Sequence, residues 1–103
     1  MQIPLQITIR GIPHSEALDL RIREKATKLE EFHPRITSCR VTVEEMKKHQ
    51  HQGREFQVGI DITVPGKEIV VNKVRDEDAY VALRNAFDAA KRQLDELPRT
   101  KQG

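Results

Sequence analysis

Residues 56–64 alternate apolar and polar side chains without a break, which is the pattern of a strand with one buried face. Residues 3–9, 36–44 and 68–74 alternate in a similar way. A sheet made of such strands has one apolar face and one wet face. The remaining elements must therefore cover the same side of the sheet, which predicts a fold of two layers.

Two segments have helical periodicity instead. Ser15 is a suitable N-cap for a first helix that runs to about residue 32. A second helix begins near Asp76 or Asp78 and stops at Pro98. Each helix has one apolar stripe, formed by Leu18, Ile22, Ala26, Leu29 and Phe32 in the first and by Leu83, Phe87, Ala90, Leu94 and Leu97 in the second.

The predicted order of elements is β-α-β-β-β-α. The first two strands are joined through a helix and can lie parallel. The later strands form antiparallel hairpins, the last of them with its turn at Pro65 and Gly66. We predict a single α+β domain over residues 1–98, with a four-stranded mixed sheet and both helices on one face. Residues 99–103 are predicted to form a short flexible tail.

The composition limits the chemistry of this domain. Cys39 is the single cysteine and alternates inward, so the chain has no internal disulfide and no cysteine-based metal site. His49 and His51 have strand-like spacing, but no acid cluster completes a metal site around them. There is no phosphate-binding glycine loop or dinucleotide fingerprint. We therefore predict a protein without catalysis, cofactor, metal or small-molecule substrate.

The pattern of apolar residues also bears on localisation. No apolar run is long enough to cross a membrane, and the first residues alternate instead of forming the block of a signal peptide. These observations predict a cytoplasmic protein with no membrane partner.

The basic residues are segregated rather than abundant. The chain has 18 Lys+Arg against 16 Asp+Glu, and a net charge of +2 does not by itself indicate a nucleic-acid partner. Helical geometry nevertheless places basic residues beside both apolar stripes: Arg21, Lys25 and Lys28 on the first helix, and Arg84 and Lys91, with Arg92 further out, on the second. If the helices pack side by side, these flanks join into a ridge that can follow a phosphate backbone.

An ordinary solvated surface explains the same charges, because exposed helix faces are rich in Lys and Arg. Asp88 is spaced to pair with Arg84 and with Arg92. Charge placement alone leaves both interpretations open.

Three stretches of the chain have the spacing of a known family: SEALDLRIREKATKLEEF, TVPGKEIVV and DAYVALRNAFDAAKRQL. In them the chain resembles the ribosome hibernation promoting factors, which include the ribosome-associated translation inhibitors and were once described as modulators of an alternative sigma factor. The last stretch follows the family's D-x-Y-x-A…D-x-x-x-R-Q-L pattern. The likeness extends over about residues 3–97 and departs from the family at Ala89 and Glu96, where basic residues are common.

The resemblance implies a domain that binds the small ribosomal subunit in the channel for messenger RNA and tRNA. Occupying that channel inhibits translation or promotes ribosome hibernation during starvation or stationary phase. Lys25, Lys28, Tyr80 and Arg92 match family positions in the two helices. The expected contacts with ribosomal RNA are then Arg21, Lys25, Lys28, Tyr80, Arg84, Lys91 and Arg92, with Lys47 and Lys48 of a polar loop as additional contacts.

The resemblance also bears on further partners. Long members of the family carry a second, dimerising domain after a linker, and this chain, ending at Gly103, is expected to lack one. A separate ribosome-dimerising factor is therefore an expected partner. Whether a short member of this kind promotes or opposes ribosome pairing is not decided by the sequence.

Two other functions stay open at this point. A general structured-RNA-binding domain would use the same basic flank for recognition by shape. A protein-interaction module would use the exposed sheet face or its edges instead. Tyr80 either stacks on a base or packs with its hydroxyl at the rim of the core.

Overall fold

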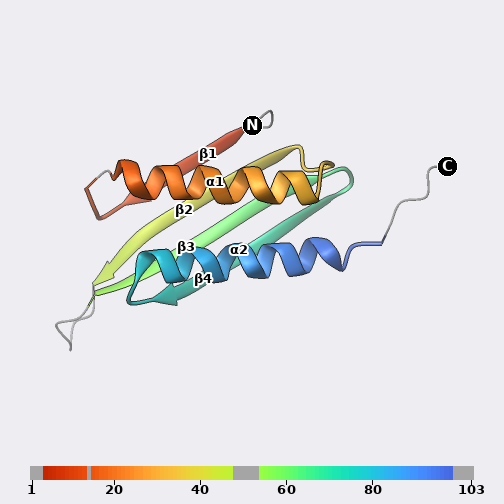
Figure 1. Cartoon of the computed structure of the whole chain (residues 1–103). Helices are drawn as coiled ribbons and strands as arrows, with labels where there is room; N and C mark the ends of the chain where they lie inside the picture. Colours follow the sequence, from red (N-terminus) through yellow and green to blue (C-terminus); the bar gives the residue numbers. More distant parts are fainter. Residues whose placement is uncertain (1–3, 14, 48–53, 99–103) are drawn as a thin grey trace.

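The computed structural model describes residues 4–13, 15–47 and 54–98 (Figure 1). In these ranges the elements follow the predicted order: β1 (Leu5–Arg10), α1 (Glu16–Phe32), β2 (Ser38–Lys47), β3 (Arg54–Val64), β4 (Lys67–Asp76) and α2 (Ala79–Asp95). The predicted α+β class is therefore confirmed. Ile3 and the predicted tail, residues 99–103, lie outside the described residues.

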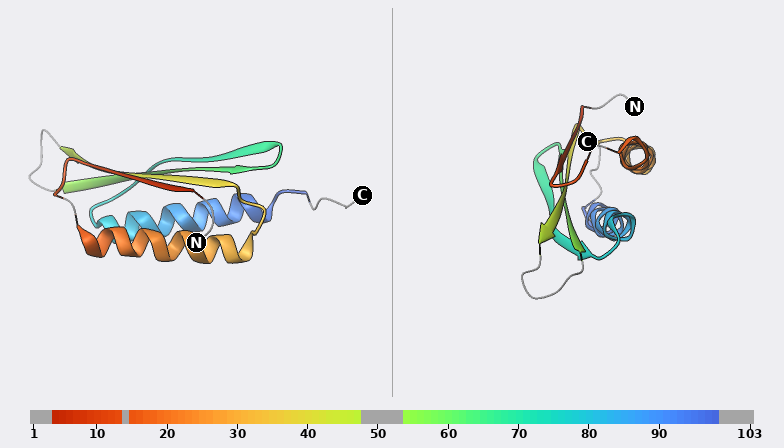
Figure 2. Two further views of the ribbon diagram at one scale, coloured as in Figure 1. Left: turned by 90° about the horizontal axis from the view of Figure 1, so that it is seen from above. Right: turned by 90° about the vertical axis from the view of Figure 1, so that its left-hand side faces the viewer.

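The described strands form a four-stranded sheet in the order β1-β2-β3-β4. β1 pairs with β2 in parallel, and the pairs β2–β3 and β3–β4 are antiparallel, as predicted. The hairpin turns at Pro65 and Gly66, and Gly66 has φ +82°, a conformation that glycine adopts without strain. Both helices lie against the same face of the sheet, α1 beside β1 and α2 over β3 and β4 (Figure 2).

The core lies between this face and the helices. Residues of the central strands that alternate inward are almost fully buried, namely Val41, Val43, Val58, Ile60 and Ile62. Cys39 belongs to the same core, and burial, with a smaller effect from Asp61, raises the pKa of its thiol to about 11. A thiol with such a pKa stays neutral at physiological pH, which agrees with a packing role.

Several boundaries differ from the prediction. β2 begins at Ser38, while Ile36 is buried just before it. β4 extends to Asp76 because Asp76 pairs with Phe56 of the long β3 strand. α2 therefore begins at Ala79, with Asp78 as its N-cap.

The N-caps stabilise both helix starts. The Ser15 hydroxyl accepts a hydrogen bond of 3.1 Å from the backbone N–H of Leu18, and the Asp78 carboxylate accepts one of 2.8 Å from that of Tyr80. Each bond satisfies a backbone donor that the helix itself leaves unpaired. The predicted cap of the first helix is thus confirmed, and the start of the second is fixed at Asp78.

The prediction for Phe32 is wrong. Its spacing placed it in the buried stripe of the first helix, but its side chain is 59% exposed. Phe32 is the last residue of α1 and lies on the flank that faces α2, where the Lys91 ammonium sits over its ring. The residues of α1 that do pack on the sheet are Leu18, Ile22, Ala26 and Leu29.

Candidate functional site

The two helices lie side by side and run in the same direction (Figures 1 and 2). Two contacts between a cation and an aromatic ring join them. The guanidinium carbon of Arg21 lies 5.3 Å from the centroid of the Tyr80 ring, and Nζ of Lys91 lies 5.3 Å from the centroid of the Phe32 ring. Such a contact contributes roughly 0.5–1 kcal/mol at an exposed site, so each pair helps to fix the cation in place.

These contacts define which flank of each helix faces the other. On α1 the positions 21, 25, 28 and 32 are separated by three or four residues, so they form one stripe. On α2 the positions 80, 84 and 91 likewise share one flank. The contacts of Arg21 with Tyr80 and of Phe32 with Lys91 join residues with the same separation in the sequence. Lys25 and Arg84 have that separation too, so they lie at the same level along the two helices.

We call this line of residues the basic seam. It consists of Arg21, Lys25, Lys28, Tyr80, Arg84 and Lys91. The structure thus brings together most of the residues predicted to contact RNA, from two segments far apart in the sequence. The two basic flanks join because the helices pack side by side, which the sequence alone does not establish.

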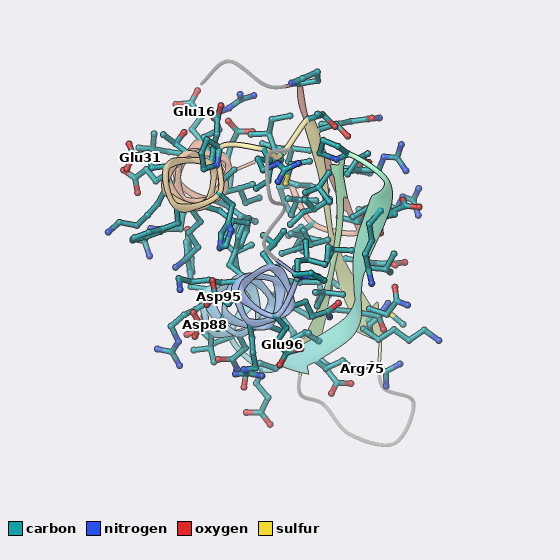
Figure 3. The ribbon with its side chains drawn as sticks, turned by 90° about the vertical axis from the view of Figure 1, so that its right-hand side faces the viewer. Glu16, Glu31, Arg75, Asp88, Asp95 and Glu96 are labelled. Carbon is teal, nitrogen blue, oxygen red and sulfur yellow. The ribbon has the colours of Figure 1, made fainter. Side chains whose placement is uncertain are left out.

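Much of the positive charge of the seam is uncompensated. Among the described residues, Lys25, Lys28 and Arg84 form no ion pair. Arg21 lies 3.6 Å from Glu24, but both side chains are more than half exposed, so this pair is weak. Glu16 and Glu31 project from the side of α1 that is turned away from α2 (Figure 3).

The pairing expected for a plain solvated surface is not formed. Asp88 makes no ion pair with Arg84 or with Arg92 in the described part of the chain. Cations without local acidic partners can accept an external anion without first giving up an internal one. The cations of the seam are therefore available to an external anion.

Other predicted residues do not join the seam. Arg92 is exposed but follows Lys91 directly, so it lies about 100° further round α2 and away from α1. Lys47 is the last residue of β2, and its side chain is not among those that the structure describes. Lys48, His49 and His51 lie outside the described residues.

A hydrogen-bonded cluster closes the end of the seam. One oxygen of Asp95 lies 2.9 Å from Nζ of Lys91, and the other lies 2.8 Å from Nε2 of His33. The hydrogen bond from Lys91, joined by that from His33, lowers the pKa of Asp95. His33 and Asp95 are far apart in the sequence, and no local pattern predicted their contact.

The Asp95 cluster gives a prediction for acid titration. We expect Lys91→Gln to raise the pKa of Asp95 towards its ordinary value, because the main cause of its lowering is removed. Since the folded pKa lies below the unfolded one of about 4, the contribution of this contact to stability is present above that pH. It is lost as the pH falls through the folded pKa.

Carboxyl-detected NMR titration of the folded protein measures this pKa directly. Arg92→Gln is the matched control, because it removes one positive charge from the same turn of α2 without touching Asp95. An unchanged Asp95 pKa in Lys91→Gln would contradict the assigned cause.

A cavity of about 650 Å³ lies beside this cluster, where both helices end next to the β3–β4 turn. Its lining residues are Phe32, His33, Arg35, Val64, Pro65, Lys67, Leu94, Asp95, Leu97 and Pro98. We call it the end cavity. No local pattern in the sequence predicts it, because its walls come from three separate segments.

Neither a metal-binding group of side chains nor a membrane-spanning helix is found in the described residues. In residues 4–13, 15–47 and 54–98, no three residues among His, Cys, Asp and Glu are grouped to hold a metal ion. No helix of the described structure is both long and apolar enough to span a bilayer.

Known structures share this fold. A ribosomal subunit interface protein from Coxiella burnetii superposes with a TM-score of 0.77 at 18% identity, covering 91% of this chain and 96% of that one. The N-terminal domain of Protein Y from Thermus thermophilus gives a TM-score of 0.68 at 17% identity, with coverage of 89% and 96%. At these identities the likeness shows the fold.

Sequence comparison gives the family. A search of curated proteins returns no significant match. Residues 5–101 match the family described as sigma 54 modulation protein / S30EA ribosomal protein. That match takes in all the helices and strands described above. The chain belongs to the sigma 54 modulation protein / S30EA ribosomal protein family.

Proposed function

We propose that this protein binds the small ribosomal subunit and inhibits translation by occupying the channel for messenger RNA and tRNA. The observation that carries the proposal is the basic seam, in which Lys25, Lys28 and Arg84 form no ion pair with any described residue. Because the chain belongs to the S30EA ribosomal protein family, we expect the seam to bind ribosomal RNA rather than another polyanion.

The seam suits a phosphate backbone for two reasons. Its cations lie in a line along two parallel helices, so successive phosphates can be contacted without bending either helix. The N-terminal ends of both helices lie at the same end of the molecule, and their dipoles add positive potential there. Affinity from such contacts comes largely from released counterions and is therefore sensitive to salt.

The residues have separate roles in this proposal. Lys25, Lys28 and Arg84 contact phosphates directly, while Arg21 is held over the Tyr80 ring and reaches the RNA from there. In this proposal Tyr80 orients a cation, which differs from both roles that its sequence position left open, stacking on a base and packing at the rim of the core. Arg92 contributes at the outer border, with Lys47 and Lys48 as additional contacts.

The mechanism is exclusion rather than catalysis. A domain bound in the channel prevents messenger RNA and tRNA from entering, and no covalent bond is made or broken. We infer that residues 1–98 form the binding domain, that residues 99–103 are a tail, and that the protein acts in the cytoplasm. A separate factor would then bring the inhibited ribosomes together in pairs.

Sedimentation with purified small subunits tests the proposal. We expect the protein to co-sediment with the small subunit and with whole ribosomes at low salt, and to be released as salt rises. With three to five phosphate contacts, log K should fall against log salt with a slope of roughly −2 to −4. The control is a naked RNA duplex at equal nucleotide concentration.

The possible outcomes separate the candidate functions. Equal affinity for the duplex and for the subunit would favour a general structured-RNA-binding domain. Binding to the subunit that salt does not weaken would point to a protein contact through another surface. A protein that stays at the top of the gradient at every salt concentration would contradict the proposed function.

A further inference from the structure

The two exposed aromatic residues both lie where the helices meet. The chain has three phenylalanines, one tyrosine and no tryptophan. Phe87 is buried and Phe56 is half-buried, whereas Tyr80 is 37% exposed and Phe32 59% exposed. These two exposed rings lie near opposite ends of the line between the helices, each under a cation of the other helix.

We propose that Phe32 and the end cavity hold one unpaired base of the RNA whose backbone follows the basic seam. This inference rests on the proposed function and names a further contact of the same binding surface. The ligand is a single-stranded nucleotide: its base enters the cavity against the Phe32 ring, and its phosphates continue along the protein.

The surroundings of Phe32 suit stacking. Lys91 sits over the ring, yet Phe32 is 59% exposed, so ring surface remains accessible to a further stacking partner. Unpaired bases of RNA stack on such exposed rings. Lys91 polarises the ring from the far side and is itself held by Asp95 at 2.9 Å, so the platform is fixed before the base arrives.

The end cavity has the size and chemistry of a base site. Its volume of about 650 Å³ lies within the range of small-ligand pockets. Apolar walls can receive the two flat faces of a base, and they are formed by Val64, Pro65, Leu94, Leu97 and Pro98. Polar groups can meet the edges of the base, because Asp95 offers carboxylate acceptors and His33 a ring nitrogen.

The charges favour a base over a phosphate at this place. Both helices end here, and the negative ends of their dipoles, together with Asp95, repel an anion more than a neutral base. Arg35 and Lys67 line the cavity on the side of the strands, where they can meet the phosphate that follows. The seam thus favours binding of phosphates near the N-terminal ends of the helices. Near their C-terminal ends it favours binding of a base.

The test uses the full chain and purified small ribosomal subunits. We expect Phe32→Leu to weaken binding roughly 10-fold, since stacking on one base is lost, with the salt dependence unchanged. Phe32→Trp retains a stacking surface and should restore most of the affinity. Leu20→Ala is the control, because Leu20 is equally exposed, at 58%, on α1, but it directly precedes Arg21 and so lies about 100° round the helix from the seam.

Photocrosslinking identifies what meets the ring. With p-azidophenylalanine at position 32, we expect a crosslink to a nucleotide of ribosomal RNA, and none when the same group stands at position 20. A crosslink to a ribosomal protein alone would overturn the proposal, as would equal binding of Phe32→Leu and the wild type.

The inference and the proposed function can fail separately. If variants of the basic seam lose binding while Phe32→Leu does not, the seam stands and the base site is wrong. If the wild-type protein does not bind small subunits at all, both are wrong.

Discussion

Replacing Arg21, Lys25 and Lys28 together with glutamate is expected to abolish association with the small subunit. Lys25 and Lys28 form no ion pair in the described structure, so their charge is available to RNA phosphates. At about 1 kcal/mol for each lost contact, removal alone weakens binding roughly 100-fold. Repulsion by three new carboxylates adds to that loss.

A matched pair of triple variants separates the seam from net charge. Arg21, Lys25 and Lys28 are changed to Gln in one, and Arg10, Arg40 and Arg75 in the other, so both lose the same formal charge. The second set is exposed on the strands β1, β2 and β4 rather than on a helix. We expect only the first set to lose about 100-fold in affinity and to flatten the salt slope by roughly 2–3.

Fluorescence anisotropy with labelled protein measures both quantities, and circular dichroism shows that each variant is folded. Equal losses in the two triples would mean that binding depends on overall charge. In that case the seam would have no special role.

The second large effect concerns the core. Leu18→Ala is expected to lower the free energy of unfolding by about 2–5 kcal/mol, because Leu18 is only 3% exposed and its removal leaves a cavity between α1 and the sheet. For a domain of this size that change lowers the Tm by roughly 10–30 °C. The loss is a large part of the 5–15 kcal/mol that stabilise a typical domain.

Leu20→Ala is the same substitution two positions along the same helix. Leu20 is 58% exposed, so we expect a change within about 0.5 kcal/mol. Urea denaturation followed by circular dichroism compares the two variants directly. Similar destabilisation by both would contradict the packing of α1 on the sheet through its Leu18 side.

Much of the fold could be predicted because its signals are local. Alternation along the strands shows which side of each is buried, and Ser15 and Asp78 supply the caps that start the helices. The ends of strands were less certain where pairing with a neighbouring strand determines them. β4 continues to Asp76 because β3 offers Phe56 as a partner, and nothing within β4 itself indicates this.

The candidate site was predicted in part. The basic flanks follow from the helical repeat, and the family resemblance directed attention to Lys25, Lys28 and Tyr80. Phe32 was misassigned because spacing alone cannot separate a stripe that packs on a sheet from the adjoining flank that meets another helix. Arg92 fitted the family pattern, but its position on α2 places it off the seam.

The sequence by itself determined the elements, the side of each that is buried and the family, since these depend on periodicity and on matched residues along the chain. Only the tertiary structure decided how the two helices meet. The contacts of Arg21 with Tyr80, of Lys91 with Phe32 and of His33 with Asp95 each join segments about sixty residues apart. Such contacts depend on how both helices pack on the shared sheet, and no stretch of sequence contains that information alone.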